Sequence, residues 1–406
     1  MAADRMNLNR VMPAQGKELV LPDIRPKQNR EHLDAVIVGA GVIGLASAWR
    51  AAQSGLRVRV IERAEPGSGA SGVAAGMLAP VGEATWGEED LLDAALASHG
   101  LWAEFADELA DSGHAESSLL RSGALHVALD ADEAGELRRR FDLMGSLGLE
   151  ADWLSGRECR ELEPGLGPSA FGGVHAPHEA GVDPLAIVSA LRRACESEGA
   201  EIVTGTEVTG AIYDGDAIRG VLCDDGAEHR ADVMVLAAGA WSGSADWLPD
   251  GALPPVRPVK GQIITLRGAP AEPVAGRIVV SERVYLVPRS DGRLIVGATV
   301  EEMGFDTRVT AGGVYELLRE AYRALPDTAE LELERVVAGL RPGTPDNAPI
   351  VGRGNVDGLV LATGHFRNGI LLAPLTAIGV VALIRGEAVP SELAVADPAR
   401  FEKVGT

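Results

Sequence analysis

The chain has 406 residues, 46% of them hydrophobic, and so can bury one large core or two smaller ones. Its formal net charge of −22 disfavours nucleic acid and anionic membrane surfaces as partners, because both bind basic patches. No apolar run reaches the ~20 residues of a membrane-spanning helix, and the three cysteines, Cys159, Cys195 and Cys223, lack the spacing of a disulfide framework or a zinc site. We therefore expect no nucleic-acid or membrane partner, no metal site and a cytoplasmic location.

The first predicted elements follow a polar segment that prolines interrupt. Residues 1–31 lack the apolar region of a signal peptide, and we expect them to form a flexible N-terminal extension. Residues 36–38 predict a buried strand, 42–53 an alanine-rich helix and 57–62 a second strand. This βαβ unit of about thirty residues has the usual size of such a unit.

A loop of small residues over 67–77 comes next, and the periodicity beyond it predicts elements of both kinds. In chain order they are a helix over 91–109, a strand over 122–129, a helix over 136–144, a strand over 173–175, a helix over 184–197, a strand over 201–204, a β-meander over 208–238, alternating strands over 256–300, a helix over 314–324, a buried strand over 359–364 and a helix over 370–384.

Buried, parallel-type strands therefore occur early, in the middle and late in the chain, with antiparallel stretches between them. This order predicts an α/β fold (α+β overall), a Rossmann-like nucleotide-binding domain with an inserted antiparallel-sheet substrate domain. We expect the following division: 32–112, 178–248 and 336–390 in the nucleotide-binding domain, 113–177 and 249–335 in the substrate-binding domain, and 391–406 as a C-terminal tail.

The first strand leads into a G-x-G-x-x-G turn formed by Gly39, Gly41 and Gly44. The first glycine permits the tight turn, the second lets the backbone approach a pyrophosphate, and the third lets helix and strand pack closely. Phosphates would then lie at the helix N-terminus, where free N–H groups and the helix dipole favour anions. Glu62, 23 positions after Gly39, can accept hydrogen bonds from ribose hydroxyls and would repel a 2′-phosphate, which disfavours NADP.

Three further features favour FAD over NAD. The loop from Ala70 to Met77 offers backbone amides and the Ser71 hydroxyl to a second phosphate and a ribitol chain. A strand ends in small residues at Gly239, which permits close approach of a cofactor. The amides of His365 to Gly369, leading into a helix, can hold the electron-rich edge of a reduced flavin. An NAD dehydrogenase would leave the last two features unused.

With these motifs, the chain resembles the glycine oxidases of thiazole (thiamine) biosynthesis, within the D-amino-acid oxidase and sarcosine oxidase superfamily. The most specific stretches are 76–78, 284–289, 339–344 and 364–374, and the resemblance covers about 34–387. It implies FAD contacts at Val42, Ile43, Glu62, Arg63, Ala70, Ser71, Ala75, Gly76, Met77, Val208, His365, Phe366, Arg367, Asn368, Gly369, Ile370 and Leu371. It implies noncovalent FAD, because related enzymes attach flavin through a cysteine near the C-terminus and this chain has none after Cys223.

The substrate carboxylate needs a permanently charged, bidentate partner, for which arginine is suited. Arg341, before a Pro-Gly pair, is the main candidate and is similar to the carboxylate-binding arginine of the family. The resemblance also places Arg367, Tyr285 and Met77 at the substrate pocket, so Arg341, Arg367 and Tyr285 are the predicted catalytic residues. Arg367 could instead neutralise reduced flavin, and Tyr285 could be a structural residue of a sheet.

Two departures from the family pattern bear on the pocket. Val300 stands where the family often has a methionine, and Arg283 replaces a neutral or histidine-like position near the tyrosine. His365 is expected to be a backbone-anchored residue beside the flavin, with a proton shuttle as the alternative. Lys260 is the one lysine inside the expected folded body, and we expect it to have no essential role in the reaction with O₂.

The implied activity is oxidation of glycine, and also of sarcosine and small D-amino acids, by O₂ and water to glyoxylate, ammonia and hydrogen peroxide. The product imine would feed thiazole assembly, and the enzyme would be a homo-oligomer. Three alternatives stay open: a D-amino-acid dehydrogenase that passes electrons to a quinone, a non-catalytic flavoprotein scaffold, and an NAD dehydrogenase.

Overall fold

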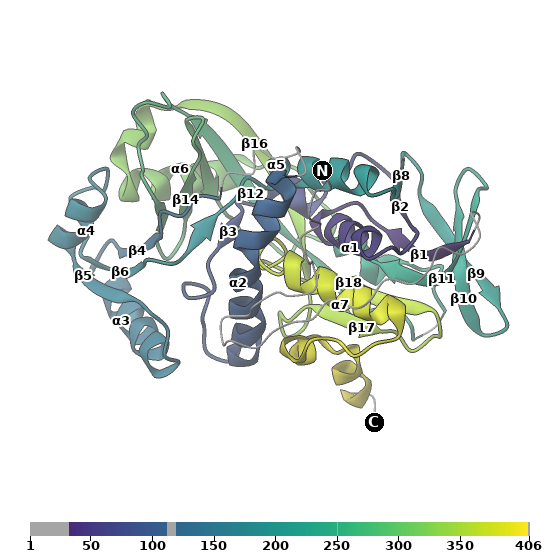
Figure 1. Ribbon diagram of the computed structural model, residues 1–406. Helices are drawn as coiled ribbons and strands as arrows, with labels where there is room; N and C mark the ends of the chain where they lie inside the picture. The colour runs from purple at the N-terminus through teal and green to yellow at the C-terminus, as the bar shows by residue number, and fades with distance from the viewer. Residues whose placement is uncertain (1–31, 112–118, 250, 405–406) are drawn as a thin grey trace, which may run out of the picture.

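Two eight-stranded sheets form the framework of the computed structural model (Figure 1). The structure describes residues 32–111, 119–249 and 251–404. The expected N-terminal extension and the last two residues of the expected tail lie outside the described residues. Among the helices that are described, none is long and apolar enough to cross a bilayer.

The first sheet has a parallel centre, as the buried apolar strands predict. Its main path is β17 (Ile350–Arg353), β18 (Leu359–Thr363), β11 (Glu228–Leu236), β1 (Leu33–Val38), β2 (Val58–Glu62) and β8 (Glu201–Thr204). Only the pairing of β17 with β18 is antiparallel on this path. The carboxyl ends of β1, β2 and β11 meet at one edge, where a ligand site is expected in such sheets.

Helices cover one face of this sheet and a β-meander covers the other. One core joins the sheet to α1 (Val42–Gln53), α2 (Glu89–Asp111), α5 (Pro184–Ser197) and α7 (Ala373–Arg385). Asp183 begins α5 by accepting hydrogen bonds from the N–H groups of Leu185 and Ala186. On the other face, a second core includes β9 (Val208–Asp214) and β10 (Ala217–Cys223).

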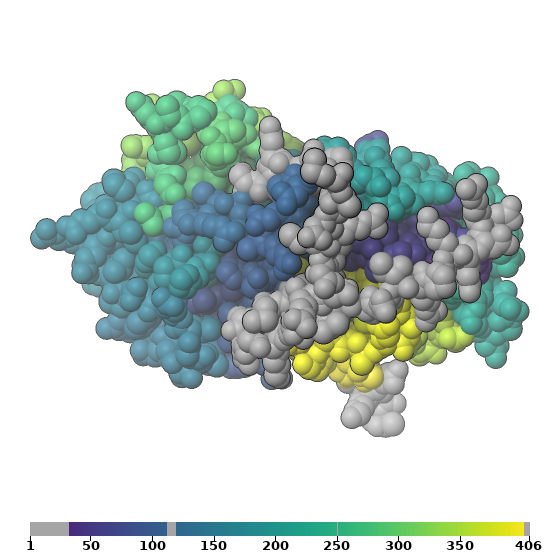
Figure 2. All heavy atoms as spheres, viewed as in Figure 1, coloured from purple at the N-terminus to yellow at the C-terminus, as the bar shows by residue number. Residues whose placement is uncertain are grey.

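The second sheet is mixed, because β13 runs parallel to β4 while the other neighbours are antiparallel. Its order is β16 (Glu332–Gly343), β12 (Arg257–Arg267), β15 (Arg293–Gly297), β14 (Tyr285–Pro288), β13 (Ile278–Val280), β4 (Ala124–Ala128), β6 (Gly172–Ala176) and β5 (Asp152–Ser155). Contacts with these strands are made by α3 (Ala131–Ser146), α4 (Gly156–Leu162) and α6 (Ala311–Ala324). In Figure 2 the green atoms of this half lie at the upper left, and purple atoms from the first part of the described chain lie to the right of them.

Smaller elements connect the two sheets. A two-stranded ribbon pairs β3 (Met77–Leu78) with β7 (Ala180–Gly181). Two 3₁₀ helices come after strands: η1 (Ala70–Val73) after β2 and η2 (Gly239–Ser244) after β11. Three come after helices: η3 (Pro326–Glu330) after α6, and η4 (Ser391–Ala396) and η5 (Pro398–Val404) after α7.

The mixed α/β architecture is confirmed, and the helices predicted over 42–53 and 184–197 have the predicted bounds. Two details differ. Residues 336–343, expected in the nucleotide-binding domain, pair with β12 and complete β16 of the second sheet. The helix expected from 370 begins at Ala373, because the residues before it form the turn that leads into Pro374. The short elements β5 and α4 gave too few residues for a periodic signal.

Candidate active site

A cavity of about 790 Å³ is lined by residues of both sheets. Its wall is formed by the carboxyl ends of β1 and β2, by the loop after β18 and by residues of β12, β14, β15 and β16. Every residue predicted to bind cofactor or substrate lines it except Gly44. The two glycine-rich segments at opposite ends of the chain therefore meet at one site.

The turn after β1 has the geometry that close approach requires. Gly39 has φ +108°, and a Cβ there would lie 2.5 Å from the carbonyl oxygen of Ala237. A Cβ on Gly44 would lie 1.9 Å from the carbonyl oxygen of Gly39, so this glycine acts in packing rather than in the cavity wall. The N-cap of α1 is Gly41, whose missing side chain leaves the helix N-terminus open to an anion. Ser71 approaches the same turn and accepts a hydrogen bond from Val42 N–H at 3.0 Å.

Glu62 stands at the end of β2 with its carboxylate fixed by the backbone. Its Oε2 accepts from Ala40 N–H at 2.7 Å and its Oε1 from Ala64 N–H at 3.0 Å. Beside it, the Arg63 guanidinium lies 4.1 Å from the ring centroid of Trp241. Trp241 lines the cavity and was not predicted. The signal that could have found it is an aromatic residue directly after the small residues that end β11.

The loop between β18 and α7 is fixed from two sides. Phe366 N–H donates to the Pro342 carbonyl at 2.9 Å, which ties the loop to β16. The Leu371 carbonyl accepts from Ser98 Oγ at 2.7 Å and from Trp102 Nε1 at 2.9 Å, which ties it to α2. The loop amides that line the cavity are therefore held in place before any ligand arrives.

His365 is a buried residue of this loop, with 2% of its surface exposed. Its Nε2 lies 3.0 Å from Thr376 Oγ1 on α7. Burial lowers the pKa of His365 to about 3, so the ring is neutral at physiological pH. A neutral ring fixed to a hydroxyl fits an anchor of the loop, and a proton shuttle would need a pKa closer to neutrality.

Arg341 and Tyr285 lie over two glycines of the second sheet. A Cβ on Gly261 would lie 2.4 Å from Arg341 Nη1, and a Cβ on Gly297 would lie 2.4 Å from Tyr285 Oη. Arg341 Nη1 donates to the Thr299 carbonyl at 3.1 Å, which leaves its charge without a carboxylate partner among the described residues. Burial raises the pKa of the Tyr285 phenol, and the Arg341 charge acts in the opposite direction.

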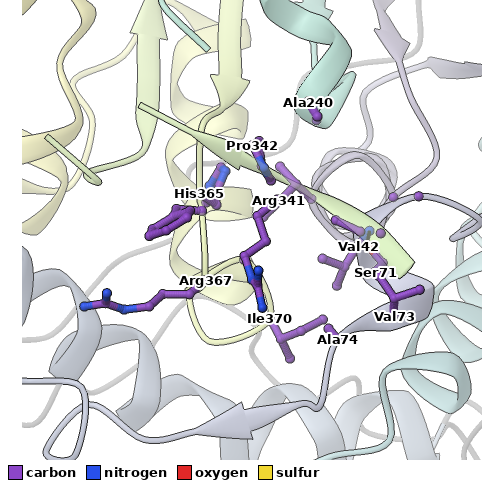
Figure 3. Close-up of a pocket in the computed structure, with 18 of the residues that line it drawn as sticks. Val42, Ser71, Val73, Ala74, Ala240, Arg341, Pro342, His365, Arg367 and Ile370 are labelled. Atoms are coloured by element: carbon purple, nitrogen blue, oxygen red, sulfur yellow. Dashed lines mark hydrogen bonds between the residues drawn. The ribbon is translucent and has the colours of Figure 1, made fainter. Parts of the chain in front are cut away.

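Arg367 lines the cavity, but its guanidinium extends away from Arg341 (Figure 3). Its Nη2 donates to Glu88 Oε2 at 2.6 Å, and its Nε forms an ion pair with Glu83. Asn347 Nδ2 donates to the other Glu88 oxygen at 2.8 Å. Arg367 is thus part of the cavity wall, and its charge is paired with two carboxylates that were not predicted.

The side chain of Lys260 takes no part in this arrangement. Its side chain is buried, does not line the cavity and forms an ion pair with Glu301 across 3.1 Å. Two further residues that the sequence did not suggest, His126 and Arg140, line the part of the cavity formed by β4 and α3. His126 Nε2 lies 3.4 Å from Glu179 Oε2, and both side chains are buried.

The residues present fit FAD. The cavity is long enough to run from the α1 N-terminus to the loop before α7, and a side chain at Gly39 would collide with Ala237. Residues 34–383 match the family model described as FAD dependent oxidoreductase (DAO). FAD, when bound, supplies a ring that accepts two electrons and a proton.

Comparison with known proteins gives the same family. The chain is 35% identical over 365 residues to the glycine oxidase of Geobacillus kaustophilus, which covers 89% of this chain and 95% of that protein. It is 37% identical over 373 residues to the bifunctional protein ThiO/ThiG of Synechocystis, covering 91% of this chain and 54% of that protein, so it spans about half of that relative. The crystal structure of glycine oxidase from Geobacillus kaustophilus superimposes with a TM-score of 0.84 at 34% identity, covering 91% of this chain and 99% of that one. The chain belongs to the FAD dependent oxidoreductase (DAO) family and, within it, is similar to glycine oxidases.

Proposed function

We propose that this chain is an FAD-dependent oxidase that converts glycine, O₂ and water to glyoxylate, ammonia and hydrogen peroxide, and that it also accepts sarcosine and small D-amino acids. The observation that carries the proposal is Arg341, a guanidinium without a carboxylate partner among the described residues, in the wall of the cavity that holds the FAD-binding turn. The similarity to a glycine oxidase over 95% of that protein supports the substrate class.

The side chains of the wall supply orientation. Arg341 would hold the substrate carboxylate through two hydrogen bonds, and Tyr285 would donate a third from its protonated phenol. Met77 and Ile370 line the same cavity with apolar surface, which keeps water from the α-carbon. If the amine enters uncharged, removal of a hydride equivalent from the α-carbon needs no strong general base, and the imine product is hydrolysed by water.

The proposal also covers how FAD is attached, which sheet binds it, where the enzyme acts and what it supplies. The described cysteines are buried and none lines the cavity, which supports noncovalent FAD and a reducing, cytoplasmic location. The first sheet would be the FAD-binding domain and the second sheet the substrate-binding domain. Similarity to proteins named glycine oxidase supports O₂ as the acceptor. Assembly as a homo-oligomer is a further part of the proposal. Similarity to the bifunctional ThiO/ThiG protein supports a role in supplying glycine imine for thiamine biosynthesis.

A peroxide assay of the purified protein with glycine, sarcosine, D-alanine and D-proline tests the proposal, together with anaerobic bleaching of the flavin by each substrate. We expect bleaching by glycine and one peroxide for each glyoxylate formed. Bleaching with little peroxide in air would instead indicate a dehydrogenase that uses a quinone. A yellow protein that no amino acid bleaches would indicate a scaffold, and a colourless protein would contradict FAD binding.

A further inference from the structure

Five arginines line the cavity, and they differ in what their charges contact: Arg63, Arg140, Arg283, Arg341 and Arg367. Arg63 forms an ion pair with Glu207 across 3.7 Å, Arg140 donates to the Gly82 carbonyl, and Arg367 is paired with two carboxylates. Arg341 donates to backbone carbonyls. Arg283 alone among these five makes no hydrogen bond or ion pair with any residue that the structure describes.

Arg283 is carried by a short, fixed turn beside the substrate-binding pair. The turn joins β13 to β14, and Ser281 N–H donates to the Val284 carbonyl at 2.8 Å across it. Tyr285, two residues after Arg283, begins β14 and lines the same cavity. The arginine is therefore held close to Tyr285 by the chain itself, and it is an exposed residue of the cavity lining.

The neighbourhood of Arg283 favours a small anion from solution over an internal partner. Glu282 lines the cavity in the same turn but forms no ion pair with Arg283. Val300, 70% exposed, is an apolar neighbour in the cavity lining. Arg283 also lines a smaller pocket with Glu282, Glu301 and Glu316, but it forms no ion pair with any of them, so its guanidinium keeps its N–H donors for an anion in the main cavity.

We propose that Arg283 is a specificity residue that binds a second carboxylate of the substrate, so that this enzyme accepts amino dicarboxylic acids in addition to glycine. The inference rests on the proposed function, because it takes Arg341 and Tyr285 as the holders of the first carboxylate. One end of a dicarboxylate would lie on Arg341, and the other would reach the turn that carries Arg283. Neutral amides of the same shape would lack the second ion pair.

Binding of inert acids tests this separately from oxidation. Succinate and its half-amide, succinamate, have nearly the same shape and no amine, and their binding to the FAD-loaded protein can be followed by the change in flavin absorbance. We expect succinate to bind the wild type more tightly than succinamate. Arg283→Gln should weaken succinate binding about fivefold, the scale of one partly exposed ion pair, and leave succinamate unchanged. Glu282→Gln, in the same turn, should not weaken succinate binding.

Kinetics with D-aspartate and D-asparagine supply the second readout. Arg283→Gln should lower kcat/KM for D-aspartate about fivefold relative to D-asparagine and leave kcat/KM for glycine within about twofold. Equal effects on succinate and succinamate, or no effect on either, would overturn the proposal. If glycine yields no peroxide while succinate binding still depends on Arg283, the proposed function fails and the second-carboxylate site stands.

Discussion

Arg367 and Glu88 are joined by a hydrogen bond of 2.6 Å between residues that are 279 positions apart in the chain. The contact links the loop before α7 to the segment that leads into α2, and Glu83 of that segment lines the cavity. Arg367 therefore closes one side of the cavity by holding this segment against the loop. In this position Arg367 stabilises the cavity wall without contacting the substrate carboxylate.

The first prediction follows from this pairing. Arg367→Ala leaves two partly buried carboxylates unpaired and should lower the free energy of unfolding by about 1–2 kcal/mol. The KM for glycine should change less than in Arg341→Ala. A double-mutant cycle with Glu88→Gln, measured by urea unfolding, should give a coupling of about 1 kcal/mol. A KM effect equal to that of Arg341→Ala, with no coupling, would instead assign Arg367 to the substrate.

The second prediction concerns Arg341. Arg341→Ala removes a bidentate, charge-assisted contact and should lower kcat/KM for glycine about 100-fold, or about 3 kcal/mol, mostly through KM. Arg341→Lys keeps the charge but not the two parallel donors, and its effect should be intermediate. Flavin absorbance should be retained in both variants. An unchanged KM in Arg341→Ala would remove this residue from the substrate site.

The third prediction concerns the two glycines that lie beneath the side chains of Arg341 and Tyr285. Gly261→Ala and Gly297→Ala place a methyl group 2.4 Å from the present positions of Arg341 Nη1 and Tyr285 Oη. These atoms end flexible or rotatable side chains, so the fold should adjust while the side chains leave their positions. We expect kcat/KM for glycine to fall at least about tenfold, with little loss of thermal stability.

Gly312→Ala is the matched control for this pair. Gly312 lies in α6, and a Cβ there meets nothing within 4 Å. The control should keep wild-type kinetics and be as stable as the wild type or slightly more so. If Gly261→Ala and Gly297→Ala behave like the control, the close packing of Arg341 and Tyr285 on the sheet has no role in binding.

The first βαβ unit could be predicted from sequence because its signals are local. The apolar strand, the glycine turn and the helix with its stop lie within thirty residues, and each feature depends on its neighbours in the chain. The residues of the FAD site could be predicted for the same reason, because Glu62 and the loop before α7 belong to motifs that are continuous in the sequence. These residues line one cavity in the structure.

Contacts between distant segments could not be predicted. The sequence contains nothing near Arg367 that indicates Glu83 or Glu88, because the pairing depends on how α2 lies against the loop. The parallel pairing of β13 with β4 also joins distant segments, and no local sequence signal indicates it. Residues 336–343 pair with β12 in the second sheet, a partner that the pattern of an extended apolar segment does not indicate.

The fourth prediction is a pH dependence of stability from His365. Burial lowers the pKa of this ring from 6.5 to about 3 in the folded protein. Between pH 6.5 and pH 3 the unfolded chain therefore binds one more proton than the folded chain. The contribution of the neutral ring to the free energy of unfolding is complete above pH 6.5 and is lost as the pH falls, by about 1.4 kcal/mol per pH unit. Urea unfolding should show a shallower dependence between about pH 6 and pH 5 in His365→Gln than in the wild type.

His178→Gln is the control for that measurement, because the His178 ring is exposed and its Nε2 lies 3.1 Å from the carboxylate of the exposed Glu150. It should keep the wild-type slope. Parallel slopes in wild type and His365→Gln would show that the ring is protonated in the folded state, and a proton-transfer role for His365 would then deserve direct kinetic study.

The fifth prediction concerns Lys260 and the reaction with O₂. Lys260 forms an ion pair with Glu301 and does not line the cavity, so its charge lies outside the wall that O₂ would meet. Lys260→Met removes the charge, keeps most of the length of the side chain and should leave the reoxidation rate of reduced flavin within about tenfold, or about 1.4 kcal/mol. Glu301→Gln reports the loss of the same ion pair with the lysine retained. Stopped-flow reoxidation that collapses in Lys260→Met but not in Glu301→Gln would show that the Lys260 charge acts on the flavin through the sheet.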